Sequence, residues 1–367
     1  MSRSVLLAND TSTWYHFGCT ATSLGVRNSL EQLGYDVETL PITASHGLRQ
    51  IPEGIEQFDD PGHFRKFQAA NPEVLGRLAS HDCLAINGEG TLHGLKPVTK
   101  GLLYLAYVAK TRLGKHVSVI NHSCYPNSQG TYTPDGEAEA LYRKVYQALD
   151  FIAVREPRSL KYLEEMGVSA TLSFDCMPIT IASQFDVASL QPVRKVVLAG
   201  CVSLNSFMLE VYAYLIEMLN RQDVTVEVLI GAVANLAADD ARFVTSLSKR
   251  CPAGWDLVAA KSLHEWLRCI GEAQLLISGR FHHTIAAVCL GTPFITFESN
   301  TPKVSGVFEL LGQEPPLSST DAQSFEKCLE LLSVRFGQRH DPGPILNALT
   351  ALAQENFVPY RAGQAER

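Results

Sequence analysis

Short apolar segments rich in β-branched residues alternate with longer amphipathic segments along almost the whole chain. Buried parallel strands have near-continuous apolar sequences, and the helices that cover them show one apolar stripe at helical spacing. The alternation therefore predicts an α/β protein with helices on both faces of parallel sheets. Strands are predicted at residues 5–8, 37–42, 83–87, 117–121 and 151–154, then at 195–199, 225–230, 256–258, 275–278 and 293–296.

The alternation breaks at residues 183–194, where apolar periodicity is lost. Since 367 residues are many for one domain, we predict a boundary there. The expected architecture is two Rossmann-like, doubly wound domains, at residues 1–185 and 186–340, facing across a cleft. Residues 341–367 are expected to form a helix that packs back, followed by a polar tail. Ligands of such sheets bind at the carboxyl ends of strands, so the loops there are the candidate sites.

Composition narrows the class of protein. A net charge of −7 argues against a nucleic-acid-binding protein, which needs a basic excess. The nine cysteines are scattered without a C-x-x-C pair, which favours a reducing compartment. The first apolar run is too short for a signal peptide, and no segment approaches the ~18 apolar residues of a spanning helix. We expect a cytoplasmic protein whose membrane association, if any, is peripheral; its oligomeric state is not predicted.

The segment 278–303 carries the densest set of reactive side chains. A predicted strand leads into Gly279, Arg280 and His282, where a helix begins, and the next strand leads to Lys303. A helix start offers backbone N–H groups to an anion, and arginine binds carboxylate or phosphate bidentately. His282 can donate a proton near neutral pH, and Lys303 adds positive charge. The alternative is an arginine paired with an acidic residue beside histidines that cap a core helix.

The loop NGEGTLHG, residues 87–94, follows a second predicted strand. Glycines there let a ligand approach the backbone, although the loop is neither a Walker A motif nor G-x-G-x-x-G. Glu89 is a candidate acid or base, or a helix cap, while Asn87 and His93 are candidate acceptor-binding residues.

Two further loops follow predicted strands. Arg155 and Asp175 end successive β-elements, where they can reach a ligand or form a buried ion pair. The first loop, NDTSTWYHFGCTAT at residues 9–22, is long and rich in hydroxyl and aromatic groups. Its Asn9, Trp14 and His16 are predicted to contact a sugar acceptor, the alternative being a surface cover. Motifs for zinc, a serine nucleophile or a D-x-D metal site are lacking, so we expect a metal-free mechanism.

Over roughly residues 4–312 the chain resembles the polysaccharide pyruvyl transferase family. The most specific parts are SGRFH at 278–282 followed by Gly291-x-Pro293, and Arg155-x-x-x-Ser159 with Asp175. The resemblance implies two Rossmann-like domains arranged as in GT-B glycosyltransferases. It also implies transfer of a pyruvyl group from phosphoenolpyruvate, without a cofactor, to a sugar hydroxyl of a bacterial surface glycan or its lipid-linked precursor at the inner face of the membrane.

The resemblance also implies roles for the candidate residues. His282 would be the general acid, and Asp175 or Glu89 would deprotonate the sugar hydroxyl. The donor's phosphate and carboxylate would be bound by Arg280 and Arg155, supported by Lys303, Ser278 and Gly279.

One departure keeps other functions open. Many family members have glycines where this chain has Glu89, and a carboxylate beside an anionic donor is unfavourable unless it is used. A second hypothesis is therefore a GT-B-like glycosyltransferase with a nucleotide-activated sugar such as CMP-Kdo, retaining, with Asp175 and Glu89 as its carboxylate pair. A third is a sugar-binding or assembly protein without turnover.

Overall fold

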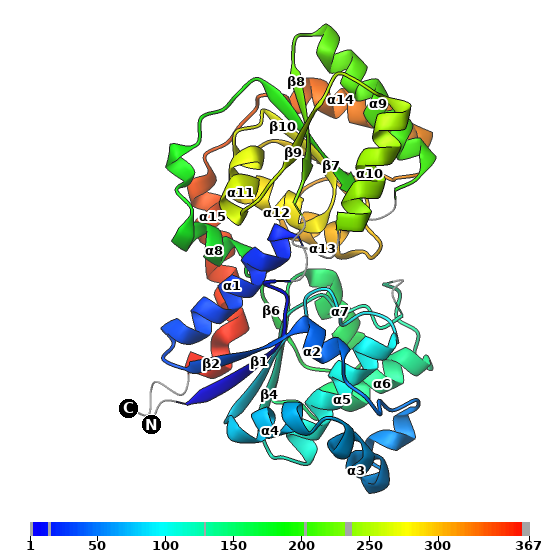
Figure 1. Cartoon of the computed structure of the whole chain (residues 1–367), viewed down its shortest axis with the longest axis vertical. Helices are drawn as coiled ribbons and strands as arrows, with labels where there is room; N and C mark the ends of the chain where they lie inside the picture. Colours follow the sequence, from blue (N-terminus) through cyan, green and yellow to red (C-terminus); the bar gives the residue numbers. More distant parts are fainter. Residues whose placement is uncertain (1–2, 14–15, 128–129, 202–203, 232–236, 362–367) are drawn as a thin grey trace. The chain divides into compact units, whose positions relative to one another are not determined.

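The structure is a computed structural model that describes residues 3–13, 16–127, 130–201, 204–231 and 237–361. The chain divides into two compact units. Unit 1 comprises Met1–Thr13, Ser23–Cys176 and Ala351–Arg367, and unit 2 comprises Trp14–Thr22 and Met177–Thr350. The predicted fold class, α/β with Rossmann-like parallel-sheet domains, is confirmed (Figure 1).

Unit 1 is built on a parallel sheet in the order β2-β1-β3-β4-β5-β6. This is the flavodoxin-like order extended by one strand, and its topological switch point lies between β1 and β3. The strands are β1 (Ser4–Asp10), β2 (Asp36–Pro41), β3 (Cys83–Asn87), β4 (His116–His122), β5 (Phe151–Val154) and β6 (Thr171–Leu172). The helices are α2 (Ile42–His46), α3 (Pro61–Ala70), α4 (Pro72–Ser80), α5 (Pro97–Thr111), α6 (Glu137–Tyr146), α7 (Pro157–Glu165) and α16 (Val358–Arg361), with 3₁₀ turns η1 (Ile55–Phe58) and η3 (Gln354–Phe357).

Unit 2 is built on a parallel sheet in the order β11-β10-β7-β8-β9. Counted from β7 this is the Rossmann order, with its switch point between β7 and β10. The strands are β7 (Lys195–Cys201), β8 (Thr225–Ile230), β9 (Asp256–Ala259), β10 (Leu275–Gly279) and β11 (Phe294–Thr296). The helices are α8 (Met177–Gln184), α9 (Ser206–Arg221), α10 (Ala237–Arg250), α11 (Leu263–Gly271), α12 (Phe281–Cys289), α13 (Lys303–Leu310) and α14 (Ala322–Arg335), with 3₁₀ turn η2 (Val187–Ser189). Helices α1 (Phe17–Gln32) and α15 (Pro342–Ala353) each contribute residues to both units.

Each sheet has its own apolar core. In unit 2, alternate strand residues such as Val196 and Leu198 pack with buried side chains of α9, α10 and α14. In unit 1, Leu84 and Val117 belong to a core formed with α4, α5, α6 and α7. Alternation places the other residues of each strand on the opposite face, so the central strands β3 and β10 are buried along their whole length, whereas β2 and β9 at the sheet edges are partly exposed.

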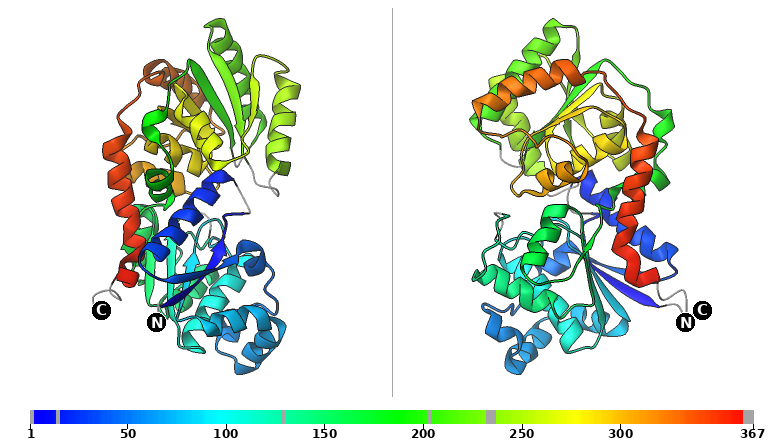
Figure 2. Two further views of the ribbon diagram at one scale, coloured as in Figure 1. Left: turned by 60° about the vertical axis from the view of Figure 1, so that its left-hand side comes forward. Right: turned by 180° about the vertical axis from the view of Figure 1, so that it is seen from behind.

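The unit boundaries differ from the predicted domains. Unit 2 includes Trp14–Thr22, and after Cys176 the chain passes into unit 2 again at Met177, before the predicted boundary at residue 185, since α8 packs against α12. The C-terminal segment contributes to unit 1 (Figure 2). There Asn356 Oδ1 accepts from the backbone N–H of Asn121 at 2.7 Å, and the Tyr360 hydroxyl bonds Ser118. Among the helices of the described residues, none is long and apolar enough to cross a bilayer.

Candidate functional site

Arg280 lies at the topological switch point of unit 2. Strand β10 ends at Gly279 beside Cys201, the last residue of β7. A Cβ on Gly279 would lie 2.4 Å from Cβ of Cys201, so only glycine allows the two strand ends to approach this closely. Arg280 follows at once as the N-cap of α12, and its backbone N–H donates to Ser278 Oγ at 3.1 Å. The β10 sequence thus delivers an arginine to the place where doubly wound sheets bind ligands.

The close strand approach at Gly279 gives a prediction. We expect Gly279→Ala to lower the free energy of unfolding by about 1–3 kcal/mol, because the added methyl overlaps the Cys201 side chain. Urea unfolding measures the change. Gly76→Ala is the matched control: within the described residues nothing lies near its added Cβ, and it lies inside α4, where alanine is the better helix former. A Gly279→Ala protein as stable as wild type would contradict the packing argument.

The Arg280 guanidinium is held by two side chains of unit 2. Its Nη2 donates to Asp240 Oδ1 at 2.7 Å, and its Nη1 donates to Nε2 of His16. The Arg280 and Asp240 side chains are 14% and 6% exposed, so this ion pair is largely shielded from water. Of the five guanidinium N–H groups, those not used by Asp240 and His16 have no partner among the described residues. They are the donors that a ligand anion can use.

His16 is a neutral acceptor in this arrangement. A guanidinium group only donates hydrogen bonds, so Nε2 of His16 must accept and Nδ1 must carry the proton. Nδ1 then donates to the Gly231 carbonyl oxygen at 3.3 Å. Burial, followed by the charge of Arg280, lowers the pKa of His16 to about 2. The residue was predicted to bind the acceptor, whereas the structure brings it to Arg280, the predicted donor-binding residue.

Neutral His16 makes stability depend on pH. The unfolded chain protonates this residue below its ordinary pKa of 6.5, while the folded state binds no proton until about pH 2. Its contribution to stability is therefore complete above pH 6.5 and is lost progressively as pH falls below that value. Between pH 7 and pH 5 we expect the free energy of unfolding of His16→Gln to fall by about 2 kcal/mol less than that of wild type.

Glutamine retains an acceptor for Arg280, and urea unfolding at each pH measures the effect. His264→Gln, at an exposed position, is the matched control substitution. Equal pH dependence in the His16 variant and wild type would show that His16 is not neutral in the folded state.

Asp240 is a site residue that the sequence analysis missed. It lies in the first turn of α10, and its Oδ2 accepts from the Gly231 backbone N–H at 3.2 Å. Burial raises its pKa, an effect that the nearby Arg280 charge opposes. Acidic residues in a first helical turn are common, so the sequence around Asp240 contains no signal of its pairing with an arginine 40 residues later. Asp240 neutralises much of the Arg280 charge, and the guanidinium acts chiefly as a directed donor.

His282 is packed closely by the start of α1. A Cβ on Gly18 would lie 2.3 Å from the His282 Cβ, and Cys19 Sγ lies 3.8 Å from His282 Nδ1. Cys19 was not among the predicted site residues. His283 points away into the core, where Trp266 Nε1 lies 3.3 Å from its Nε2 and burial lowers its pKa well below the usual value. The ~100° step between adjacent helix residues directs the two histidines to different neighbours, His282 to Cys19 and His283 to Trp266.

Lys303 adds positive charge near the same helix. It is the first residue of α13 and does not lie at a strand end, and its Nζ lies 5.6 Å from the centroid of the Phe281 ring. A cation over an aromatic face is stabilised by the ring quadrupole, which holds the ammonium beside the start of α12. The N-terminal end of α12 adds the partial positive charge of its helix dipole in the same part of unit 2.

Three asparagines lie at the carboxyl ends of adjacent strands beside the switch point of unit 1: Asn9 in β1, Asn87 in β3 and Asn121 in β4. All three are fully buried. Asn9 Nδ2 donates to the carbonyl oxygens of Asn87 and Glu89 at 2.7 and 3.1 Å, and Asn121 Nδ2 donates to Asn87 Oδ1 at 2.8 Å. Asn9 and Asn121 have φ of 62° and 54°, a conformation that asparagine tolerates better than most residues. Their amides support the loop from within, so Asn9 and Asn87 present little surface to an acceptor.

Glu89 lies in this supported loop and is buried. Its backbone N–H donates to Asn87 Oδ1 at 3.2 Å, and the following Gly90 has φ of 72°. A Cβ on the preceding Gly88 would lie 2.7 Å from the His122 Cβ, so the loop rests on the imidazole of His122. Burial lowers the pKa of His122 to about 3, and its Nε2 bonds the Tyr146 hydroxyl at 2.8 Å. The sequence analysis missed this neutral histidine.

His93 lies at the end of the same loop and is only partly buried. It forms an isolated parallel bridge with Tyr125, and its carbonyl oxygen accepts from Thr99 Oγ1 at 3.3 Å. Trp14, the remaining predicted acceptor residue, lies outside the described residues.

Arg155 and Asp175 form a buried ion pair in unit 1. Arg155 Nη1 lies 2.7 Å from Asp175 Oδ2, and Arg155 Nε donates to Ser123 Oγ at 2.8 Å. The two side chains are 2% and 0% exposed. The ion-pair alternative raised for these residues is therefore present in the structure. The predicted donor and catalytic residues fall into two sets, Arg280, His282, Lys303, Ser278 and Gly279 in unit 2, and Arg155, Asp175 and Glu89 in unit 1.

Comparison with known proteins adds a family and a fold. The sequence model of the polysaccharide pyruvyl transferase family matches residues 16–301, most of the chain. No curated protein matches the sequence significantly.

Solved structures with a similar fold are GT-B enzymes. UDP-GlcNAc 2-epimerase from Neisseria meningitidis, solved bound to UDP-GlcNAc, aligns at 12% identity with a TM-score of 0.56 and covers 100% of both chains. Sucrose-phosphate synthase from Thermosynechococcus elongatus aligns at 14% identity with a TM-score of 0.60, again over 100% of both chains. UDP-N-acetylglucosamine 2-epimerase from Rickettsia bellii aligns at 11% identity with a TM-score of 0.56, over 100% of this chain and 97% of that one. At these identities the likeness concerns the fold alone.

Proposed function

The chain belongs to the polysaccharide pyruvyl transferase family, and on this premise we propose that it transfers a pyruvyl group from phosphoenolpyruvate to a sugar. The acceptor class in this proposal is a sugar of a bacterial surface glycan or of its lipid-linked precursor. The reaction is placed at the cytoplasmic face of the membrane, where such precursors are assembled.

The proposed reaction is an acid–base reaction without change of oxidation state. The methylene carbon of phosphoenolpyruvate takes up a proton and becomes the methyl group. Two hydroxyl oxygens of the sugar form bonds to the neighbouring carbon, whose bond to the phosphate oxygen breaks. The two hydroxyl groups each release a proton. One of these replaces the proton taken up by the methylene carbon, and the other leaves on inorganic phosphate. The enzyme must therefore bind two anionic groups, supply a proton to carbon and accept a proton from a hydroxyl.

The observation that carries the proposal is the fixed guanidinium of Arg280. Asp240 and His16 orient it from two sides, at the start of α12 and at the switch point of a Rossmann-type sheet. A donor group that is oriented before the ligand arrives loses little entropy on binding and can be directed at charge that develops in the transition state. Neutral His16 holds the guanidinium without adding a competing charge.

Catalytic roles follow from the surroundings of each residue. We assign His282, which lies in the first turn of α12 two residues after Arg280, the proton transfer to the methylene carbon. We assign Glu89 the proton from the sugar hydroxyl, because its loop is held rigidly by Asn9. Asp175 is fully buried against Arg155, so its place in the proposal is to hold that arginine.

Ligand-dependent thermal stability tests the proposal. We expect phosphoenolpyruvate at 100 times its Kd to stabilise the protein by about 2.7 kcal/mol, and with a suitable sugar diol to release inorganic phosphate. Inorganic phosphate and pyruvate at matched concentration are the control ligands. If phosphoenolpyruvate does not raise the thermal stability of the protein, the proposal is contradicted. If the protein instead transfers the sugar of a nucleotide sugar to the acceptor without releasing inorganic phosphate, glycosyl transfer replaces pyruvyl transfer as the function.

A further inference from the structure

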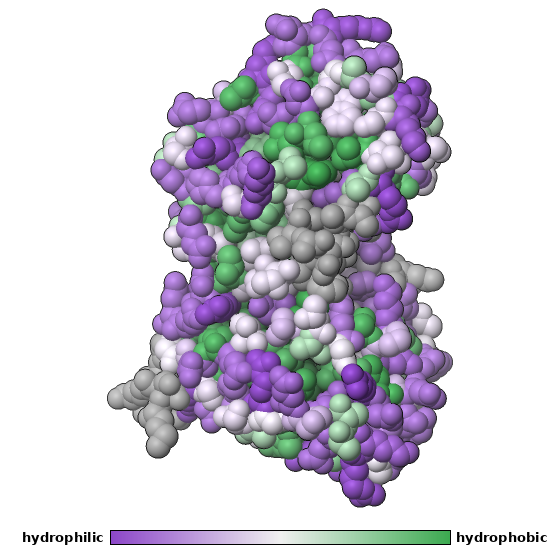
Figure 3. All heavy atoms as spheres, viewed as in Figure 1, coloured by the Kyte–Doolittle hydropathy of each residue, from purple (hydrophilic) through white to green (hydrophobic). Residues whose placement is uncertain are grey.

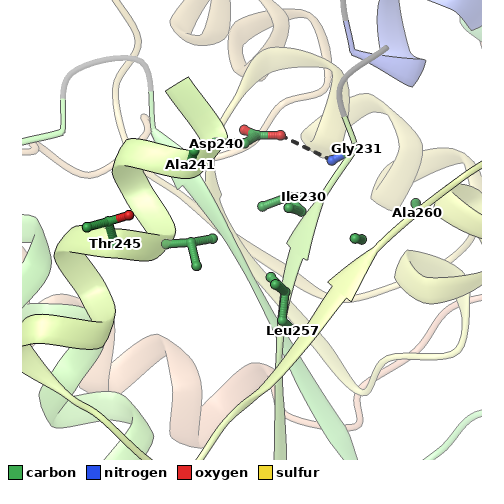
Figure 4. Close-up of a pocket in the computed structure, with 9 residues that line it drawn as sticks. Ile230, Gly231, Asp240, Ala241, Thr245, Leu257 and Ala260 are labelled. Atoms are coloured by element: carbon green, nitrogen blue, oxygen red, sulfur yellow. Dashed lines mark hydrogen bonds between the residues drawn. The ribbon is translucent and has the colours of Figure 1, made fainter. Parts of the chain in front are cut away.

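Unit 2 contains a pocket that the proposed reaction does not use. It has a volume of about 340 Å³ and lies between α10 and the carboxyl ends of β8 and β9 (Figure 4). Its walls are mainly apolar, and alanines leave the space between the larger side chains open. The described residues that line it are Ile230, Gly231, Asp240, Ala241, Val244, Thr245, Leu257, Ala259 and Ala260. Phosphoenolpyruvate has no apolar group of a size that would fill it.

Apolar surface gathers at this pocket. Leu257 is 48% exposed although it lies on β9, and Ala259 and Ala241 beside the pocket are also exposed. The space-filling view shows the hydrophobic surface over β9 and toward α10 (Figure 3). A single exposed leucine is ordinary, but exposed apolar side chains that line one concave site are typical of ligand pockets.

One end of the pocket is polar and leads to Arg280. Asp240 lines the pocket, accepts from the Gly231 N–H at 3.2 Å and pairs with Arg280 at 2.7 Å. A carboxylate offers about four lone-pair directions, so those two donors leave room for N–H groups of a ligand. The guanidinium of Arg280, on the other side of Asp240, has N–H groups for an anion. The site therefore joins an apolar slot, a hydrogen-bond acceptor and an anion-binding donor.

We propose that this pocket binds the base of a nucleotide whose phosphate reaches Arg280. A nucleobase is flat and apolar on its faces and carries N–H groups on its edge, which match the walls and Asp240 respectively. Its phosphate matches the remaining N–H donors of Arg280. The nucleotide and phosphoenolpyruvate then compete for one guanidinium. The inference goes beyond pyruvyl transfer and does not depend on it, because nucleotide binding can be measured in the absence of any reaction.

Titration calorimetry on the full chain tests this with UMP, CMP, AMP and GMP. Ribose 5-phosphate supplies the phosphate and sugar without a base, and octyl phosphate supplies an apolar chain without a base. We expect at least one nucleotide to bind tenfold or more tighter than both, and to weaken phosphoenolpyruvate binding competitively.

Ala241→Leu fills the pocket from an exposed position of α10 while keeping a good helix former. It should weaken nucleotide binding at least tenfold and leave phosphoenolpyruvate binding within twofold of wild type. Ala322→Leu, at an exposed position of α14 away from the pocket, is the matched control and should change neither.

Nucleotides that bind no tighter than ribose 5-phosphate, or as tightly to Ala241→Leu as to wild type, would overturn the inference. If octyl phosphate binds wild type as tightly as the best nucleotide, and if Ala241→Leu abolishes that binding, the pocket is a site for a hydrocarbon chain instead. Nucleotide binding without phosphoenolpyruvate binding would leave the inference standing and refute pyruvyl transfer. The reverse result would refute only the nucleotide subsite.

Discussion

Replacing Arg280 with alanine is expected to lower kcat/KM for phosphoenolpyruvate by about 10³-fold or more, which corresponds to about 4 kcal/mol of transition-state stabilisation. Asp240 and His16 orient the guanidinium. Its loss therefore removes N–H groups that are already positioned to hydrogen-bond phosphoenolpyruvate. Arg280→Lys should recover little of the activity, because one ammonium group cannot reproduce a planar set of donors. Phosphate release measured against phosphoenolpyruvate concentration provides both kcat and KM.

The same substitution leaves Asp240 buried without its cation, so stability must be measured beside activity. Circular dichroism and thermal melting identify a variant that fails only because it unfolds. Arg242→Ala is the matched control, since Arg242 lies on α10, is 78% exposed and pairs only with Asp239 among the described residues. Near-wild-type kcat/KM in a folded Arg280→Ala protein would refute the donor-binding role.

Breaking the Arg155–Asp175 pair is expected to have the largest effect on stability. Either Arg155→Ala or Asp175→Ala should lower the free energy of unfolding by about 3–5 kcal/mol, because each removes one partner of an ion pair buried inside unit 1. Urea unfolding followed by far-ultraviolet circular dichroism measures the loss.

The double variant Arg155→Met/Asp175→Leu removes both charges and should recover much of that stability. Arg27→Ala breaks a pair whose side chains are 50% and 41% exposed, and should change stability by less than about 1 kcal/mol. If the double variant keeps its stability but loses phosphoenolpyruvate binding, Arg155 binds the donor as well as supporting the fold. A loss below about 1 kcal/mol in both single variants would contradict the buried ion pair.

The hydrophobic pattern of the strands was the part of the sequence that predicted the fold reliably. The run at residues 275–278 is apolar up to Ser278 because both faces of this parallel strand are covered, and β10 spans Leu275–Gly279. The position of Arg280 could also be predicted, since SGRFH follows a strand and opens a helix by local rules alone. The resemblance to the family was carried by this motif together with Arg155-x-x-x-Ser159 and Asp175, and the family model matches residues 16–301.

Pairing between distant residues was not predictable in the same way. Asp240 and His16 meet Arg280 from positions 40 and 264 residues away, through elements whose sequences show only ordinary helix and loop signals. His16 was predicted on the acceptor side because its loop follows β1, yet Trp14–Thr22 belongs to unit 2. Likewise Asn9 and Asn87 looked like sugar ligands, and the structure uses their amides to hold the Glu89 loop.

The sequence by itself determined the α/β class, the strands and the delivery of Arg280 and His282 to a strand's carboxyl end. These depend on local backbone preferences and on hydrophobic periodicity, which neighbouring residues specify. Only the tertiary structure decided which carboxylate accompanies each arginine and which histidines are neutral. Those properties depend on burial and on partners brought together by strand order, and desolvation acts on a side chain according to its surroundings in space.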